Sequence, residues 1–252
     1  YKKQGERSNS MTKKYYIISA KGGAGATTVA AGLGFALAAA GERTLIVDGD
    51  SENGCGLTVC GCEGMQVFTL ADYARGACRA KQAMVQHPSY GNLYIMSALG
   101  CREESAVCSA VRETEGLFDF VLCDETAARA CESAIAVTEP YAPSIKAAAG
   151  VVNALRDGGK PAGLIVNKVN GGLIVNGSTP PPSEIASALG AELIAALPED
   201  LALTVGVWRQ YSKKHYRAAA AALCGKNVKM PRPEAGYTGA GGYFRRRLRE
   251  KI

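Results

Sequence analysis

The residues best suited to chemistry form a glycine-rich loop between an apolar run and an alanine-rich stretch. The loop reads Ala20-Lys21-Gly22-Gly23-Ala24-Gly25-Ala26-Thr27-Thr28. Glycines let backbone N–H groups turn inward around a phosphate, and the start of a following helix adds the positive end of its dipole. Thr27 is placed to offer its hydroxyl to Mg²⁺. The loop therefore favours phosphate binding, although a simple glycine-rich turn before a helix is the alternative.

Carboxylates follow two other apolar runs. Asp48 and Asp50 come directly after one run, and Asp124 follows another. The carboxyl ends of parallel strands are where open α/β sheets bind ligands, so these side chains are candidates for the same site. The alternative is that each carboxylate caps the N–H groups of its own loop.

The elements that position these residues are short apolar runs alternating with alanine-rich helical stretches. We expect strands at Tyr15–Ser19, Thr44–Val47, Leu93–Ser97, Phe118–Cys123, Ala134–Thr138, Leu164–Asn167 and Leu193–Leu197. We expect helices over 27–40, 103–115, 141–157 and 183–190. Most runs are continuous rather than alternating, which indicates strands covered on both faces. The predicted fold is α/β, with a mainly parallel sheet flanked by helices on both faces.

Length and charge divide the chain. Its 252 residues suit one large domain or two small ones, and we expect a single domain over 11–224. Residues 1–10 are interpreted as a tag or disordered extension, 225–242 as a flexible linker and 243–252 as a basic amphipathic helix. The two ends account for the net charge of +6, so the rest is neutral. A neutral body argues against a broad nucleic-acid surface.

The nine cysteines are interpreted as reduced thiols, because their number is odd and the sequence shows no secretory signal. No apolar run approaches the roughly 18 residues of a membrane span. Cys60 and Cys62 are an alternative half-site for a metal shared across a dimer. No further cysteine pair or histidine lies at ligand spacing, which favours incidental thiols.

The loop resembles the deviant phosphate-binding loop KGGxGKTT of the MinD/ParA family of P-loop ATPases. Lys21 matches the family's early signature lysine. Val47-Asp48-Gly49-Asp50 resembles its D-x-D switch I, and Asp124 resembles its Walker B aspartate. Asn167, with Leu197-Pro198-Glu199-Asp200, resembles its two base-side segments. The resemblance covers residues 15 to about 205 and implies a three-layer P-loop NTPase sandwich.

The resemblance also implies site roles, which follow the family residue by residue. Nucleotide binding is expected of Lys21, Gly22, Gly23, Ala24, Gly25, Ala26, Thr27, Thr28, Asn167, Pro198, Glu199 and Asp200. Mg²⁺ would be held by Thr27 and, through water, by Asp48 and Asp124. Asp50 would position the attacking water, and Lys21 would reach the partner's phosphates in a nucleotide-sandwiched homodimer. The expected cofactors are ATP or ADP and Mg²⁺.

Two departures from the family pattern affect hydrolysis. Ala26 stands where the family has the lysine that bridges the β- and γ-phosphates, so turnover should fall by orders of magnitude. After Asp124 the family pattern D-x-P-A-G is replaced by residues 125–128, which hold neither proline nor glycine. Ala26 is either an engineered substitution or a sign of a naturally degenerate member.

The chain ends in a segment that suits an anionic membrane surface. Phe244, Leu248 and Ile252 are spaced to share one helix face, and Arg245, Arg246 and Arg249 flank them. The segment resembles the membrane-targeting helix of MinD-like members of the family. A disordered basic tail or an RNA-binding patch is the alternative.

The sequence therefore predicts a MinD-like ATP-binding switch for division-site or polar positioning, cytoplasmic and peripheral on the inner face of the cell membrane. Its expected partners are a second copy, the anionic membrane and a protein activator or cargo. The alternatives are a non-enzymatic pseudo-ATPase scaffold, or a relative that partitions DNA or assembles metal centres.

Overall fold

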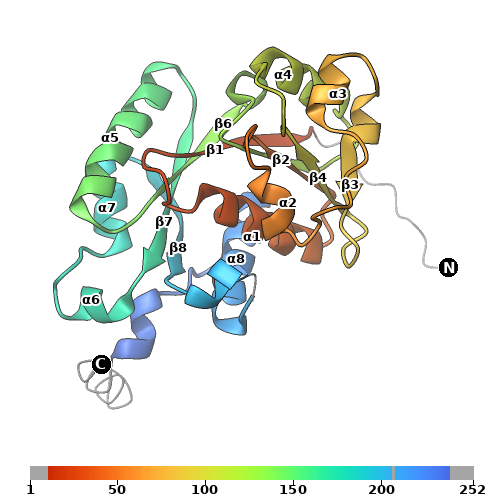
Figure 1. Cartoon of the computed structure of the whole chain (residues 1–252). Coiled ribbons are helices and arrows are strands. Elements are labelled where there is room, and N and C mark those ends of the chain that lie inside the picture. The colour runs from red at the N-terminus through yellow and green to blue at the C-terminus, as the bar shows by residue number, and fades with distance from the viewer. Residues whose placement is uncertain (1–10, 206–207, 239–252) are drawn as a thin grey trace.

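A sheet of eight strands forms the centre of the computed structural model, which describes residues 11–205 and 208–238 (Figure 1). The strands are β1 Lys13–Ser19, β2 Thr44–Asp48, β3 Met84–Gln86, β4 Leu93–Ser97, β5 Phe120–Asp124, β6 Ser133–Thr138, β7 Ala162–Val169 and β8 Glu192–Pro198. Their order is β3-β4-β2-β5-β1-β6-β7-β8, and only β3 pairs antiparallel to its neighbour within the described residues. The predicted α/β class with a mainly parallel sheet is confirmed.

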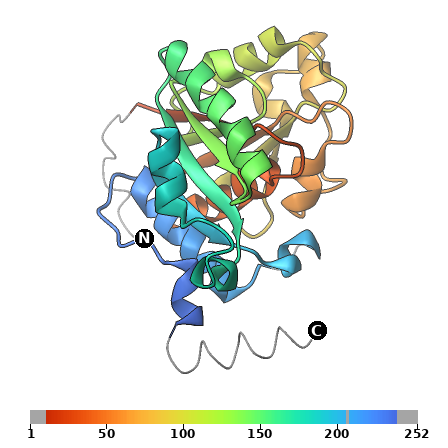
Figure 2. The same cartoon turned by 90° about the vertical axis from the view of Figure 1, so that its left-hand side faces the viewer.

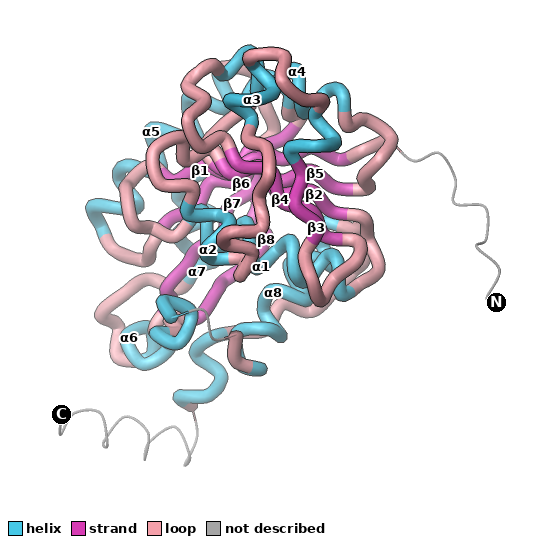
Figure 3. Tube along the Cα trace, turned by 45° about the vertical axis from the view of Figure 1, so that its right-hand side comes forward, coloured by secondary structure: helices cyan, strands magenta, loops and turns pink. Residues whose placement is uncertain are grey.

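Helices cover both faces of the sheet (Figures 1 and 2). They are α1 Ala26–Ala39, α2 Cys55–Val59, α3 Leu70–Ala74, α4 Glu104–Glu113, α5 Ala142–Asp157, α6 Gly171–Val175, α7 Pro182–Leu189 and α8 Gln210–Leu223. The core on one face joins the sheet to α1 and α8, and the cores on the other join it to α4, α5 and α7. The strands thus run through the interior, as Figure 3 shows, in three layers. Among the described residues, no helix is both long and apolar enough to cross a membrane.

Burial explains why the central strands read as continuous apolar runs. Every residue of β2 and of β5 is buried. Side chains alternate across a strand, so Ile46 joins the core under α1 whereas Leu45 and Val47 join the core under α4. A strand covered on both faces has no solvent side on which to place polar residues.

All seven predicted runs are strands, and the four predicted helical stretches are helices. The edge strand β3 was not predicted, because three residues are too few for a periodic pattern. The short helices α2, α3 and α6 and the longer α8 were also not singled out. The first half of α8 is polar and holds the run Lys213-Lys214-His215, so only its second half, residues 218–223, reads as an alanine-rich helical stretch.

Part of the predicted flexible linker over 225–242 is ordered against the domain, at residues 233–237. These residues form a 3₁₀ helix, η4 Pro233–Tyr237, which lies against α6. The approach is close, because a Cβ on Gly171 would lie 2.5 Å from the backbone oxygen of Pro233. This part of the segment is therefore packed on the domain. The predicted extension over 1–10 and the tail helix over 243–252 lie outside the described residues.

We predict that the same Gly→Ala substitution has opposite effects in two helices. A Cβ on Gly32 of α1 would lie 2.3 Å from the Tyr216 ring of α8, whereas Gly150 of α5 is exposed and a Cβ there would meet nothing within 4 Å. Gly150→Ala should raise the free energy of unfolding by about 0.5–1 kcal/mol through helix propensity. Gly32→Ala should lower it by about 1–3 kcal/mol through overpacking. Urea unfolding measures both, and a stabilised Gly32→Ala would contradict the close contact of α1 with α8.

Candidate phosphate-binding site

The loop between β1 and α1 is fixed by the end of β7. Gly25 precedes α1 with a φ of 95°, in the left-handed region. A Cβ at this position would lie 2.5 Å from Nδ2 of Asn167. That buried amide donates a hydrogen bond of 2.9 Å to the backbone oxygen of Ala24. Asn167, predicted to bind adenine, thus anchors the loop in this structure, and glycine at 25 allows it to come so close.

The outer part of the loop is open. Gly22 and Gly23 are exposed, and a Cβ on either would meet nothing within 4 Å. The Ala24 N–H donates to the backbone oxygen of Lys21 at 3.2 Å, which closes the loop as a turn. α1 begins at Ala26, so Thr27 and Thr28 lie in its first turn. The loop leaves space beside a helix N-terminus, which is the arrangement that phosphate groups occupy.

Asp124 lies beside the start of α1 with one oxygen unpartnered. Its side chain is 3% exposed and hydrogen-bonds Thr27. Within the described residues, its Oδ1 atom is buried without a hydrogen-bond partner. Burial raises the pKa of this carboxyl to about 7, and the neighbouring carboxylates Asp48, Glu125 and Asp50 add to the shift. A buried oxygen that lacks a donor is suited to face a cation.

The two carboxylates after β2 are engaged by their own loop. Asp48 pairs with Asp124 in the β2–β5 register and is fully buried. Its two oxygens accept the backbone N–H groups of Asp50, at 3.2 Å, and Gly56, at 2.9 Å. Asp50 accepts N–H groups from residues 52 and 53, and these bonds lower its pKa to about 2. Both aspartates therefore cap N–H groups of their own loop, which is the alternative to a role in ligand binding given above.

The oxygens present fit a magnesium ion. Mg²⁺ prefers hard oxygen ligands and keeps several waters, so one hydroxyl and one carboxylate suffice beside a nucleotide phosphate. Thr27 and Asp124 offer that pair. Within the described residues, no cluster of three or more His, Cys, Asp or Glu side chains could hold a metal ion by itself.

Two lysines and a glutamate meet beside the loop, and sequence analysis missed two of the three. Glu139 follows β6, and its side chain is 13% exposed. Its Oε1 lies 2.8 Å from Nζ of Lys168, and its Oε2 lies 3.9 Å from Nζ of Lys21. Lys168 also donates to the backbone oxygen of Gly23. Burial alone would raise the pKa of Glu139, but the hydrogen bonds from Lys168 and Ser144 lower it.

A sequence signal for this group did exist. Glu139 and Lys168 are charged residues at the carboxyl ends of predicted apolar runs, as Asp48 and Asp124 are. Lys168 also has a φ of 53°, which an L-residue rarely adopts and which commonly marks a functional loop. This strain could not be inferred from the sequence.

The predicted base-side segment forms a tight connection after β8. Glu199 donates its N–H to the backbone oxygen of Val169 at 3.0 Å. Asp200 accepts a hydrogen bond of 2.6 Å from the Ser212 hydroxyl and another from the Ala202 N–H. The carboxylate of Asp200 therefore joins this turn to α8.

The loop after Asp124 adopts the backbone that glycine would favour, without a glycine. Glu125 has a φ of 52° and Ala127 a φ of 53°. Residues with a Cβ in this region carry a strain of about 1–3 kcal/mol each. Gly49 lies against this loop, since a Cβ there would lie 2.4 Å from the backbone oxygen of Asp124.

All nine cysteines are free thiols in this structure. Cys60 and Cys62 are buried in the core under α1, and burial raises the pKa of Cys60 to about 12. Metal binding needs an accessible thiolate. This burial argues against the alternative of a metal site shared by these thiols across a dimer.

We predict that Asp124→Asn stabilises the metal-free protein at alkaline pH. A folded-state pKa of about 7, above the ordinary 3.8, means that wild-type stability falls as pH rises through that window. Asn cannot ionise, so at pH 8 the variant should be about 2–4 kcal/mol more stable than wild type, and at pH 4 about equal. Denaturant unfolding at both pH values measures the difference. A difference that does not change with pH would contradict the buried, uncompensated carboxylate.

Comparison with known proteins places this geometry in a family. Residues 15–204 match the family described as "CobQ/CobB/MinD/ParA nucleotide binding domain". The chain is 31% identical over 211 residues to the septum site-determining protein MinD of Bacillus subtilis (strain 168), which covers 75% of this chain and 77% of that protein. The solved MinD of Aquifex aeolicus shares the fold with a TM-score of 0.79 at 23% identity, covering 88% of this chain and 100% of that one.

A second solved structure is MinD of Pyrococcus horikoshii OT3 complexed with Mg-ADP. It shares the fold with a TM-score of 0.74 at 24% identity and covers 84% of this chain and 96% of that one. The family match spans most of the chain and coincides with the strands and loops of the site. This chain therefore belongs to the CobQ/CobB/MinD/ParA family of nucleotide-binding domains.

Proposed function

We propose that this chain is a MinD-like nucleotide switch that binds ATP or ADP with Mg²⁺ and acts in division-site or polar positioning. The observation that carries the proposal is the Asp124 carboxylate, which hydrogen-bonds Thr27 at the loop that precedes α1 and whose buried Oδ1 has no partner among the described residues. The relatives support it, since the Bacillus subtilis protein is named septum site-determining and the Pyrococcus horikoshii structure is complexed with Mg-ADP.

The proposed roles follow from where each group lies. Backbone N–H groups of the loop over 22–25 would contact phosphates, and Thr28 would reach the α-phosphate. Thr27 would hold Mg²⁺ directly and Asp124 through water. Asn167 and the turn over 198–200 would border the base. When bound, Mg²⁺ neutralises charge on the phosphates.

Hydrolysis is proposed to be slow because Ala26 brings no cation to the phosphates. Ala26 is 5% exposed at the start of α1, where the family has lysine. Lys168 is the cation that contacts the loop, through the backbone oxygen of Gly23. We propose that Lys168 supplies part of the missing charge, which supports nucleotide binding more than turnover.

Ala26→Lys should raise kcat for ATP hydrolysis by at least about 10²-fold, because it restores a cation where charge develops. Phosphate release measures the rate, and the double variant Ala26→Lys/Thr27→Val, which lacks the magnesium ligand, should lose the gain.

Lys168→Gln should weaken the affinity of the chain for ATP. Lys146→Gln, at an exposed position on α5, is the control and should leave that affinity unchanged.

If Ala26→Lys folds but neither binds nor hydrolyses ATP, the hydrolase proposal is wrong. The non-enzymatic scaffold would then be the better account of the chain, since Asp48 and Asp50 already cap their own loop.

Dimerisation is proposed to involve Lys21. In a nucleotide-sandwiched homodimer this lysine would reach the partner's phosphates. In the single chain its side chain is 53% exposed and its Nζ lies 3.9 Å from Oε2 of Glu139, so the contact is weak enough to exchange. Asp50 would have to leave the N–H groups that it caps in order to position a water.

Membrane attachment is proposed for the C-terminal segment, with the chain peripheral on the inner face of the cell membrane. The proposal rests on the apolar residues Phe244, Leu248 and Ile252 among arginines. Such a short segment binds weakly alone, and two copies on a dimer would raise the avidity. A protein activator or cargo would complete the switch.

Flotation with vesicles tests this attachment. The chain should float with phosphatidylglycerol vesicles and not with phosphatidylcholine vesicles, and added salt should weaken binding because anionic headgroups attract the arginines. Leu248→Asp should abolish flotation, and Mg-ATP should increase it if dimers form. Equal flotation of wild type and Leu248→Asp would contradict the proposal.

A further inference from the structure

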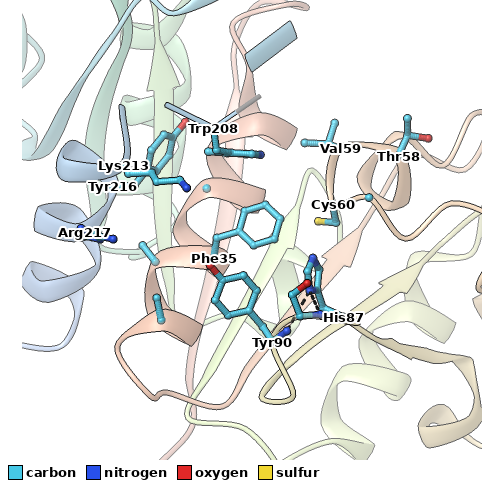
Figure 4. A pocket seen from close by; sticks show the side chains of 15 residues that line it. Phe35, Thr58, Val59, Cys60, His87, Tyr90, Trp208, Lys213, Tyr216 and Arg217 are labelled. Atoms are coloured by element: carbon cyan, nitrogen blue, oxygen red, sulfur yellow. Dashed lines mark hydrogen bonds between the residues drawn. The ribbon is translucent and has the colours of Figure 1, made fainter. Parts of the chain in front are cut away.

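A cavity lies on the α1 face of the sheet, away from the loop over 20–28. It measures about 430 Å³ and is bordered by α1, the end of α2, the segment between β3 and β4, and α8 (Figure 4). This volume lies within the roughly 300–1,000 Å³ of small-molecule sites. Phe35, one of its lining residues, follows Ala26 by nine residues, a rise of about 13 Å along α1. The cavity is therefore separate from the proposed phosphate site.

Aromatic side chains from three parts of the chain form its wall. Phe35 is central, with ring centroids 5.2 Å from Trp208, 5.8 Å from Tyr90 and 5.3 Å from His87. Trp208 in turn lies 5.4 Å from Tyr216. Figure 4 shows these rings gathered between α1 and its neighbours. Aromatic faces and edges of this kind favour a flat, unsaturated ligand.

The charge on the cavity has one sign. Lys213 and Arg217 line it from successive turns of α8, and no acidic side chain of the described residues lines it. Neither cation forms an ion pair in the part of the chain that the structure describes. Like charges spaced i, i+4 on a helix repel each other. An anion between them would remove this repulsion.

His87 adds no charge to the wall. Its Nδ1 accepts the N–H groups of Ser89 and Tyr90, its ring also hydrogen-bonds the backbone of Cys60, and burial lowers its pKa. The imidazole is therefore neutral and already satisfied. The positive charge of the cavity comes from α8.

Tyr216 contributes its ring to the wall. The residue is 2% exposed, and its ring centroid lies 5.4 Å from that of Trp208. Its hydroxyl is closed off from solvent, so a ligand in the cavity would meet the ring and not the hydroxyl.

We propose that this cavity binds a small planar aromatic anion. Its ring would lie against Phe35, Tyr90 and Trp208, and its carboxylate, sulfonate or phosphate group would bind Lys213 and Arg217. This site is separate from the loop over 20–28, so its test does not depend on the proposed function. The cavity borders α1, the helix that follows the phosphate-binding loop. It also borders the end of α2, the helix that follows Asp48 and Asp50.

Trp208 is the chain's only tryptophan, so its fluorescence reports on this cavity alone. The probe is 8-anilinonaphthalene-1-sulfonate, an aromatic anion with a flat naphthalene ring, titrated into the folded full-length chain. Binding should saturate at one probe per chain, with quenching of Trp208 and energy transfer to the probe. Lys213→Gln and Arg217→Gln should each weaken binding roughly 5- to 20-fold, as loss of a charge-assisted contact does. Lys146→Gln on α5 is the matched control and should leave the affinity unchanged.

The uncharged analogue N-phenyl-1-naphthylamine and Mg-ADP complete the design. The neutral analogue should bind at least about 5-fold more weakly, since it lacks the group that the two cations recognise. Mg-ADP should not displace the probe competitively. Equal affinity for the neutral analogue, no effect of either α8 substitution, displacement by Mg-ADP at its own affinity, or unchanged Trp208 emission would each overturn the proposal.

Discussion

The central position of β1 in a parallel sheet is the constraint on which the site depends. β1 lies between β5 and β6, so the loop after β1 lies beside Asp124 on one side and Glu139 on the other. The amide of Asn167 then fixes the loop from β7 at a contact that only glycine at 25 allows. Side chains more than a hundred residues apart are thereby held at one edge of the sheet.

The site is built around charges that the fold does not fully satisfy. Asp124 is buried, its Oδ1 has no partner among the described residues, and its pKa is about 7, so its ionisation at neutral pH costs stability. The loop that follows adds backbone strain at Glu125 and Ala127. Strain and an uncompensated carboxylate in one place are what a bound cation and phosphate would relieve. The residue that departs from the family, Ala26, lies in this same place.

Much of this architecture could be predicted from sequence, and the limits have physical causes. Buried strands such as β2 and β5 read as continuous apolar runs, so the sheet, its class and the positions of Asp48 and Asp124 follow. The sequence does not show which atoms these carboxylates bind. Asp48 accepts the backbone N–H groups of Asp50 and Gly56 because the loop after β2 turns back on itself, and this turn has no sequence pattern. The aromatic cavity could not be predicted from the sequence either, because its walls come from distant parts of the chain.

The most direct test of the account is calorimetric titration of Mg-ATP into the wild-type chain and into Thr27→Val. We propose that the loop still binds nucleotide without a lysine at 26, with magnesium held by Thr27 and Asp124. We therefore expect one site per chain with a Kd below about 1 mM, and loss of that binding in Thr27→Val or when Mg²⁺ is removed. Absence of binding heat in the wild type, with binding restored by Ala26→Lys, would contradict it and would make residue 26 indispensable.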